Sequence, residues 1–289
     1  MGAPPLASAP VVRTMESVVM PASWYAGGAT CAGSPQLTVH RAAPDFYILR
    51  QPACTSFEKP FLYLVFGTNR ALLLDTGAGG MPIAPTVDSL VADWRERHGG
   101  AAMSLVIAHS HAHADHVAGD KEFTRRADVT VVKHDTGSVR AFFRMVHWPT
   151  DESTFDIGGR VLDVLAIPGH QVASIALYDR RTGVMLSGDT FYPGRLYVRD
   201  GAAFAASIGR LVHFAEHHPV TAFLGAHIEN RDVAGEDYPE GTVDQPAEHP
   251  LPLSRADLLV LDSAVTSMRG RFVQARLAHF TIWPVLKGP

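Results

Sequence analysis

The stretch AHSHAHADHVAG, residues 108–119, places four histidines and one aspartate within eight positions. The apolar run SLVIA ends at Ala108, so a buried strand is expected to lead into the stretch. Two histidines one residue apart point to the same side of an extended segment, and the Asp-His pair two residues later turns back over them. An affinity tag would lie at a terminus, and a solvated loop would explain the polarity but not this order. Because imidazole and carboxylate ligands suit zinc and similar divalent ions, the stretch predicts a metal site.

The composition is that of an ordinary globular protein. Of the 289 residues, 46% are hydrophobic and 19% are charged, and the chain is long enough to bury a sizeable core. No apolar run reaches the roughly 18 to 20 residues that span a bilayer. We therefore expect a soluble protein with no membrane partner. A cytoplasmic location is favoured, and export is left open.

The charge pattern indicates which class of molecule the protein binds. The net charge is −4 with histidine neutral, and the lysine and arginine residues form no stripe. Enzymes that act on nucleic acids usually need a basic surface to hold phosphates. A nucleic acid is therefore disfavoured, and a small-molecule substrate is expected. The oligomeric state is left open, with a homodimer as one arrangement.

The chain contains two cysteines, Cys31 and Cys54. They could form one disulfide in an exported protein, but two unpaired structural thiols are the favoured interpretation. Neither belongs to a CxxC pair, which excludes a cysteine-rich zinc site. Residues 1–35 are expected to form a partly flexible N-terminal extension, because the first thirteen are rich in alanine and proline.

From about residue 37, short apolar runs alternate with turn signals and amphipathic stretches. Strands are expected at residues 37–50, 61–67, 71–77, 104–108, 129–133, 160–167, 173–179, 183–189 and 220–230. Helices are expected at residues 85–99, 135–146, 202–218 and 254–270. Strands and helices interleave along the whole length, which predicts an α/β layered fold with one domain over residues 36–289.

Three further positions repeat the layout of the histidine stretch. His170, Asp189 and His227 each lie at or just after the end of a strand-like run. One such histidine would more often be an ordinary loop residue, but four segments with the same layout indicate a shared site. The polar segment 231–253 follows His227 directly. It is expected to be either a surface linker to the last helix or one wall of a pocket.

In these motifs the chain resembles the metallo-β-lactamase superfamily, whose hallmark is HxHxDH followed by a distant His, a bridging Asp and a last His. Only a register that begins at His111 fits, because a start at His109 would need an acid where His113 stands. His109 is therefore expected beside the site rather than among the ligands. The resemblance extends from LLLDTGAG near residue 72 to GAHIEN at residue 230. It implies a four-layer αββα sandwich with the metals at one edge.

The resemblance also implies a dinuclear centre, with two Zn²⁺ per chain and Fe or Mn as alternatives. One ion would be held by His111, His113 and His170. The second would be held by Asp115, His116 and His227. Asp189 would bridge the two ions, and Asp75 would support the ligands from behind.

A dinuclear centre of this kind would act through a metal-bridged hydroxide. Water between two such ions ionises near neutral pH, because its pKa falls from about 15.7 to around 7. Asp115 would orient this nucleophile and pass a proton to the leaving group. Tyr192 lies where the resembling lactonases have a tyrosine that assists the substrate carbonyl, although simple packing would also explain an aromatic residue there. Arg195, Tyr197 and Arg199 could contact a substrate carboxylate.

The ligand set resembles that of glyoxalase II thioesterases and lactonases, which implies hydrolysis of a small ester, lactone or thioester. Class B β-lactamases usually carry Cys or Ser in place of Asp189, which disfavours β-lactams. The part after His227 is too short and too acidic for the glutathione-binding domain of glyoxalase II itself. The alternatives are a phosphodiesterase with the same centre and, in another class, an iron-dependent oxidoreductase such as a persulfide dioxygenase. A protein that only binds a ligand is disfavoured by the complete ligand set.

Overall fold

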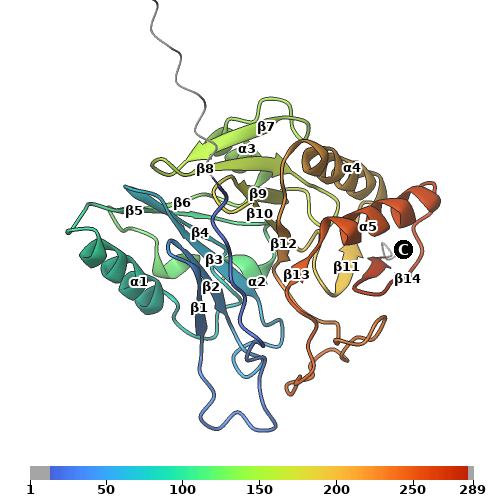
Figure 1. Ribbon diagram of the computed structural model, residues 1–289, viewed down its shortest axis with the longest axis horizontal. Coiled ribbons are helices and arrows are strands. Elements are labelled where there is room, and N and C mark those ends of the chain that lie inside the picture. Colours follow the sequence, from blue (N-terminus) through green and yellow to red (C-terminus); the bar gives the residue numbers. More distant parts are fainter. Residues whose placement is uncertain (1–13, 286–289) are drawn as a thin grey trace, which may run out of the picture.

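Two six-stranded β-sheets face each other in the computed structural model, which describes residues 14–285, and helices cover their outer faces (Figure 1). Helix α1 (Ala84–Arg97) lies against the first sheet, and α4 (Gly201–His217) and α5 (Arg255–Ser267) lie against the second. The expected four-layer αββα sandwich is therefore confirmed. Within the described residues, no helix combines the length and apolar character needed to cross a membrane.

The first sheet has the order β1-β2-β3-β4-β5-β6. Its strands are β1 (Thr38–Ala43), β2 (Phe46–Arg50), β3 (Phe61–Phe66), β4 (Arg70–Leu74), β5 (Ser104–Ala108) and β6 (Val129–Val131). The first four strands are antiparallel neighbours, and β4, β5 and β6 are parallel. The run predicted as one strand over residues 37–50 is two strands, because Pro44 lacks the N–H that a continuous ladder needs and the chain turns there.

The second sheet has the order β13-β12-β10-β9-β8-β7. Its strands are β7 (Glu152–Asp156), β8 (Val161–Ala166), β9 (Ile175–Asp179), β10 (Val184–Gly188), β12 (Ala222–Gly225) and β13 (Pro252–Leu253). The edge strand β7 was not predicted, because ESTFD has too few apolar residues to give a strand signal. The strand predicted over residues 220–230 ends early, at Gly225, so the chain leaves the sheet before His227.

The remaining elements are short or lie at the periphery. They are α2 (Ala114–Val117), a 3₁₀ turn (Asp120–Glu122), α3 (Thr136–Phe143) and a small sheet of β11 (Arg195–Val198), β15 (Thr281–Pro284) and β14 (Ala275–Arg276). Side chains cap the first turns of α3 and α5. Asp135 caps α3 by accepting from the N–H of Ser138, and Ser254 and Asp257 form a capping box at α5.

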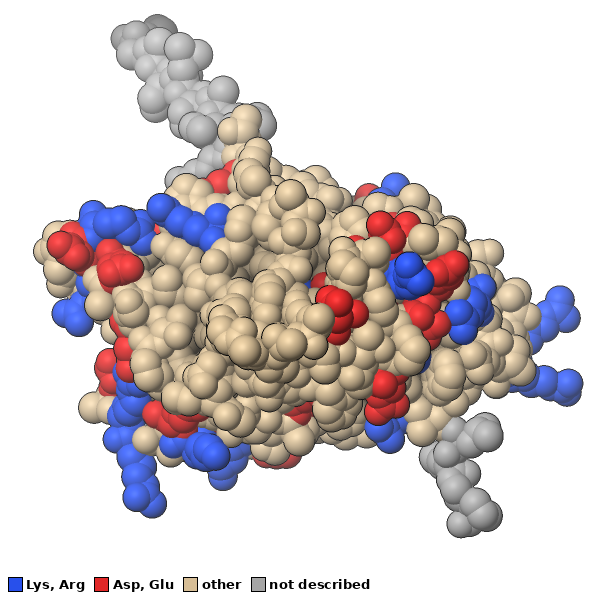
Figure 2. All heavy atoms as spheres, turned by 90° about the horizontal axis from the view of Figure 1, so that it is seen from below, with Lys and Arg blue, Asp and Glu red and all other residues tan. Residues whose placement is uncertain are grey.

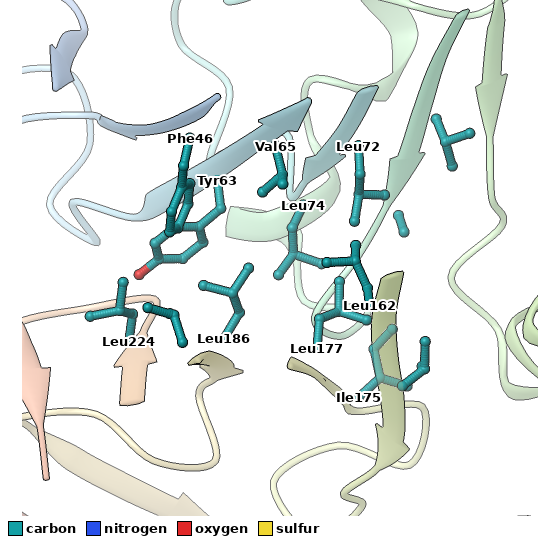
Figure 3. Close-up of a cluster of buried hydrophobic side chains, with 14 of the residues drawn as sticks. Phe46, Tyr63, Val65, Leu72, Leu74, Leu162, Ile175, Leu177, Leu186 and Leu224 are labelled. Atoms are coloured by element: carbon teal, nitrogen blue, oxygen red, sulfur yellow. The ribbon is translucent and has the colours of Figure 1, made fainter. Parts of the chain in front are cut away.

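The main core lies between the two sheets (Figure 3). Phe46, Tyr63, Val65, Leu72 and Leu74 of the first sheet point toward Leu162, Ile175, Leu177, Leu186 and Leu224 of the second. Alternate residues of the first sheet, such as those flanking Tyr63, point instead into the layer under α1. The strands are therefore buried on both faces, which explains their continuous apolar runs. This packing sets where the strand ends of the two sheets lie relative to each other.

Cys31 and Cys54 form a disulfide, so the sequence interpretation of two unpaired thiols is wrong. A separation of 23 residues says nothing about distance in space. The cysteines meet because residues 14–35 fold back over both sheets. The N–H of Glu16 donates to the carbonyl of Arg181, and the N–H of Ala53 donates to that of Ala26. The part of the predicted extension beyond residue 13 therefore packs on the sandwich, and residues 1–13 lie outside the described residues.

The disulfide should contribute substantially to stability. We expect the double substitution Cys31→Ser/Cys54→Ser to lower the free energy of unfolding by about 3 kcal/mol, because the crosslink restricts the unfolded chain. Urea unfolding with and without a reductant measures this effect. The reductant should destabilise the native protein to a similar extent and leave the double variant unchanged. Equal stability of the native protein with and without reductant would contradict the expectation.

Charged side chains are mixed on the face shown in Figure 2. Lysine and arginine residues lie among aspartate and glutamate residues, mainly around the rim of this face, and its centre is largely uncharged. Phosphate backbones are held by continuous basic surfaces, and this face does not present one. The preference for a small-molecule substrate over a nucleic acid stays a prediction.

Candidate metal centre

Four loops that each follow a strand bring the predicted ligands together. The loops follow β5, β8, β10 and β12. Within each of two groups, one nitrogen or oxygen atom per residue lies within 4.8 Å of the others. The first group is His111, His113, His170 and Asp189, and the second is Asp115, His116, Asp189 and His227. All seven predicted ligands are thus in one place, in the two groups that the resemblance implied.

Asp189 lies between the two groups and offers one carboxylate oxygen to each. Its Oδ2 is 3.7 Å from Nε2 of His111 and 3.5 Å from Nε2 of His170. Its Oδ1 is 3.5 Å from Nε2 of His116 and 3.3 Å from Nε2 of His227. This is the arrangement required of a carboxylate that bridges two cations.

Gly188 lets the end of β10 approach the histidine loop. Its φ is +51°, and an added Cβ would lie 2.7 Å from the Cβ of Ser110. A side chain at this position would therefore clash with the loop and also strain the backbone. Glycine before Asp189 keeps the bridging carboxylate close to the histidines of the β5 loop.

Hydrogen bonds to backbone carbonyls behind the ligands fix two of the imidazole rings. His170 Nδ1 donates to the carbonyl of Tyr197 at 2.9 Å, and His227 Nδ1 donates to the carbonyl of Glu58 at 2.7 Å. Since a carbonyl oxygen only accepts, both rings carry a proton on Nδ1, and their Nε2 atoms face the centre. Outer partners of this kind orient metal-ligating histidines.

Asp75 occupies the supporting position that the resemblance implied. Its Oδ2 lies 2.9 Å from Nδ1 of His116, and the carboxylate also accepts from the N–H of Ser110 at 2.7 Å and from the Ser110 hydroxyl at 2.8 Å. The φ of Asp75 is +70°, a conformation that is uncommon outside glycine and that Asp tolerates better than most residues. The buried carboxylate therefore sets the orientation of His116 and of the loop before His111.

Burial and neighbouring charges shift the pKa values of the ligands. Burial lowers the pKa of His111 well below its ordinary value and lowers that of His170 to about 4. Burial also opposes protonation of His116 and His227, but nearby carboxylates, Asp189 foremost, outweigh it and raise the pKa of both. The group that contains His111 and His170 therefore offers neutral imidazoles. In the group that contains His116 and His227, the carboxylates favour a bound positive charge.

The donor set fits divalent metal ions. His116 Nε2 and His227 Nε2 lie only 3.4 Å apart, and Asp189 Oδ1 is buried with no hydrogen-bond partner among the described residues. Buried polar atoms without a partner are unfavourable, and cations within the two groups would satisfy them. Imidazole nitrogens with carboxylate oxygens are ligands that suit zinc, iron and manganese.

His109 lies outside both groups, as the choice of register predicted. It is buried, and its Nε2 is 2.8 Å from Oδ1 of Asp120. The same carboxylate oxygen accepts from the hydroxyl of Thr76 at 2.9 Å. His109 therefore belongs to the packing beneath the histidine loop.

A cavity of about 350 Å³ opens over the ligand groups. Its floor includes His113, Asp115, His170 and Asp189. The segment 231–253 supplies one wall, through Tyr238, Pro239, Glu240, Gly241 and Gln245. Of the two interpretations of this segment, the structure therefore supports the pocket wall. A substrate in the cavity would contact both the ligand groups and this segment.

Of the two arginines in YPGRLYVRD, only Arg199 is free to bind a substrate anion. Arg195 is held by Glu229 at 3.3 Å and by Asp237 at 2.6 Å. Arg199 is exposed at the cavity mouth and has no ion-pair partner among the described residues. Tyr197 also lines the cavity.

Tyr192 does not line the cavity. Its ring is buried with its edge toward the ring of His227, and its hydroxyl donates to the carbonyl of Arg195 and lies 3.1 Å from Glu229 Oε2. The hydroxyl is thus engaged behind the cavity wall and is not presented to a substrate. The structure gives no support to the predicted contact between Tyr192 and the substrate carbonyl.

Sequence reasoning missed a buried ion cluster beside the site. The Arg50 side chain is fully buried and makes two hydrogen bonds, of 2.6 and 2.7 Å, to the carboxylate of Glu248. The ammonium group of Lys59 lies 3.0 Å from the same carboxylate and donates to the carbonyl of Ile228 at 3.1 Å. The cluster joins segment 231–253 to the backbone next to His227. The only sequence signal was a charged residue at the end of FYILR and another just before FLYLVF.

Comparison with known proteins gives a family model and relatives. A model described as the metallo-beta-lactamase superfamily matches residues 58–227. The acyl-coenzyme A thioesterase MBLAC2 of Homo sapiens is 28% identical over 225 residues, which cover 65% of this chain and 80% of that protein. A hydroxyacylglutathione hydrolase of Chromohalobacter salexigens is 30% identical over 125 residues, which cover 42% of this chain and 47% of the relative. The match thus spans about half of the second relative.

Solved structures agree in fold. A metallo-beta-lactamase from Pontibacter korlensis superposes with a TM-score of 0.52 at 16% identity, over 80% of this chain and 99% of that chain. At this identity the likeness concerns the arrangement of strands and helices alone.

Proposed function

Because the chain belongs to the metallo-beta-lactamase superfamily, we propose that it is a metal-dependent hydrolase and that its substrate is a small thioester. The observation that carries the proposal is the position of Asp189, with one oxygen toward each group of ligands on the floor of a cavity. We assign His111, His113 and His170 to one ion and Asp115, His116 and His227 to the other. Two Zn²⁺ per chain are proposed, with Fe or Mn as alternatives.

When bound, the ions supply an activated water and a positive charge that polarises the substrate carbonyl. The residues of the chain orient the reaction. Asp115 lines the cavity, and its Oδ2 lies 3.1 Å from His116 Nε2 and 3.3 Å from His227 Nε2. One Asp115 oxygen can therefore remain with the ligands while the carboxylate accepts a proton from the attacking water and passes it to the leaving sulfur.

The cavity walls would orient the substrate. Arg199 at the mouth is proposed to bind an anionic group of the leaving thiol, and Tyr197 to contact the part of the substrate beside His170. For Tyr192 we propose a supporting role. Its hydroxyl contacts the carbonyl of Arg195 and the carboxylate of Glu229, and both of these residues line the cavity.

A thioester is favoured over the oxoester and lactone alternatives by the relatives. Both the acyl-coenzyme A thioesterase and the hydroxyacylglutathione hydrolase act, by their names, on thioesters. The proposal covers both kinds of acyl group, that of an acyl-coenzyme A and that of a hydroxyacylglutathione. No observation on the described residues favours phosphodiester cleavage or an oxidation over hydrolysis.

A substrate panel tests the proposal. Zinc-loaded protein would be assayed with an acyl-coenzyme A, a hydroxyacylglutathione, the matching oxoesters, a lactone and bis-p-nitrophenyl phosphate, by release of thiol, acid or nitrophenol. We expect kcat/KM to be highest for a thioester, to vanish after chelation and to return with Zn²⁺. A higher kcat/KM for the phosphodiester, or full activity in chelated protein, would overturn it.

A further inference from the structure

A second cluster of metal-ligating side chains lies on the surface of α4. His213, Glu216 and His217 are exposed and occupy the last turns of this helix, which ends at His217. The opposite face of α4 is buried through residues such as Leu211 and Phe214. The cluster shares no residue with the centre described above and lines none of its cavity.

The three side chains are arranged as a group of ligands. One ligand atom from each lies within 4.8 Å of the other two, and the rings of His213 and His217 have centroids 4.4 Å apart. The spacing i, i+3, i+4 places all three on one helix face. His217 Nδ1 donates to the carbonyl of His213 at 2.8 Å, which leaves its Nε2 lone pair free.

The other two side chains are also available. Among residues 14–285, the imidazole of His213 and the carboxylate of Glu216 have no hydrogen-bond or ion-pair partner. In this part of the chain, residues 14–285, no arginine or lysine neutralises the carboxylate. Three donors thus share one face of the helix with no competing partner.

We propose that His213, Glu216 and His217 form a further metal site, which takes a transition-metal dication such as Zn²⁺, Ni²⁺ or Cu²⁺. Two imidazoles and one carboxylate suit these ions and leave a position for water, whereas Mg²⁺ and Ca²⁺ prefer oxygen ligands alone. The carboxyl end of a helix carries a partial negative charge, which adds to the attraction. Because the ligands are exposed, the ion binds more weakly than in the buried centre, and the site holds metal without a catalytic step.

Calorimetric titration of the zinc-loaded protein with additional Zn²⁺ tests this inference. We expect about one further equivalent per chain, as a site with three protein ligands and an open position would bind. The double variant His213→Ala/His217→Ala should lose that equivalent, while its buried ions, measured by elemental analysis after dialysis, and its thermal unfolding stay unchanged. Mg²⁺ should give no binding.

His218→Ala is the matched control. The ring of His218 stacks on Phe214 with centroids 3.9 Å apart, so it is a neighbouring histidine outside the cluster. This variant should keep the further equivalent. The inference is overturned if the native protein binds no additional Zn²⁺, or if the double variant binds as much as the native protein does.

Discussion

Replacing Asp189 with asparagine is expected to lower kcat/KM for the preferred thioester by about 10³-fold or more, since several kcal/mol of metal-dependent stabilisation would be lost. Among the residues that the structure describes, the Asp189 carboxylate is the only group that offers an oxygen to both sets of histidines. An amide keeps the shape of the side chain, but it has a single oxygen, and this oxygen is a weaker metal ligand than a carboxylate oxygen. Elemental analysis after dialysis should therefore show less zinc per chain than in the native protein, alongside the kinetic loss.

Two histidines of the stretch 108–119 provide a comparison for this experiment. His111→Gln removes a proposed ligand, whereas His109→Gln changes a histidine that lies outside both ligand groups and contacts Asp120. We expect His111→Gln to lose zinc and activity and His109→Gln to retain the zinc content of the native protein. Full zinc content and activity in Asp189→Asn would contradict the proposed bridging role.

Removing the Glu248 side chain is expected to lower the free energy of unfolding by about 3 to 5 kcal/mol, because a buried arginine would lose its partner. The guanidinium of Arg50 is 0% exposed and Glu248 is 7% exposed, so water cannot replace the lost contact. The ammonium group of Lys59 would lose an acceptor as well. Urea unfolding of Glu248→Ala measures the change.

Segment 231–253 offers a matched control. Glu236 makes an ion pair with Arg231 at 3.3 Å, but these side chains are 51% and 42% exposed, and such surface pairs contribute less than about 1 kcal/mol. Glu236→Ala should therefore leave the stability almost unchanged.

The two variants should also differ in kinetics. We expect Glu248→Ala to raise KM more than it lowers kcat, because the cavity wall loosens while the ligands remain. An equal loss of stability in Glu248→Ala and Glu236→Ala would contradict a special role for the buried cluster.

Much of the site is readable in the sequence because its signals are local. HxHxDH encodes a strand end and a turn over a few residues, and His170, Asp189 and His227 each follow an apolar run that folds as a strand. The two packed sheets bring these strand ends together, β5 from the first sheet and β8, β10 and β12 from the second, so the residues expected to be ligands meet in the structure. The layered α/β fold follows from the alternation of the same runs with amphipathic helices.

Several features of the structure could not be predicted from local sequence signals. Tyr192 has the residue type and position of a substrate-contacting tyrosine, yet its hydroxyl is engaged by Arg195 and Glu229. The pairing of Cys31 with Cys54 depends on how residues 14–35 fold back over the sandwich. Neither outcome has a local sequence signal, since each depends on which surfaces the packed sheets leave free.

The sequence alone determined which side chains can bind metal and at which strand ends they lie, because both depend on residue type and short-range spacing. The tertiary structure decided which polar groups reach the cavity. Arg50 and Glu248 are 198 residues apart in the chain, and they meet only because the two sheets pack face to face and carry segment 231–253 over the edge of the first. Contacts of that separation are set by the packing of the whole core, whereas a motif of a few residues is set by backbone geometry at one place.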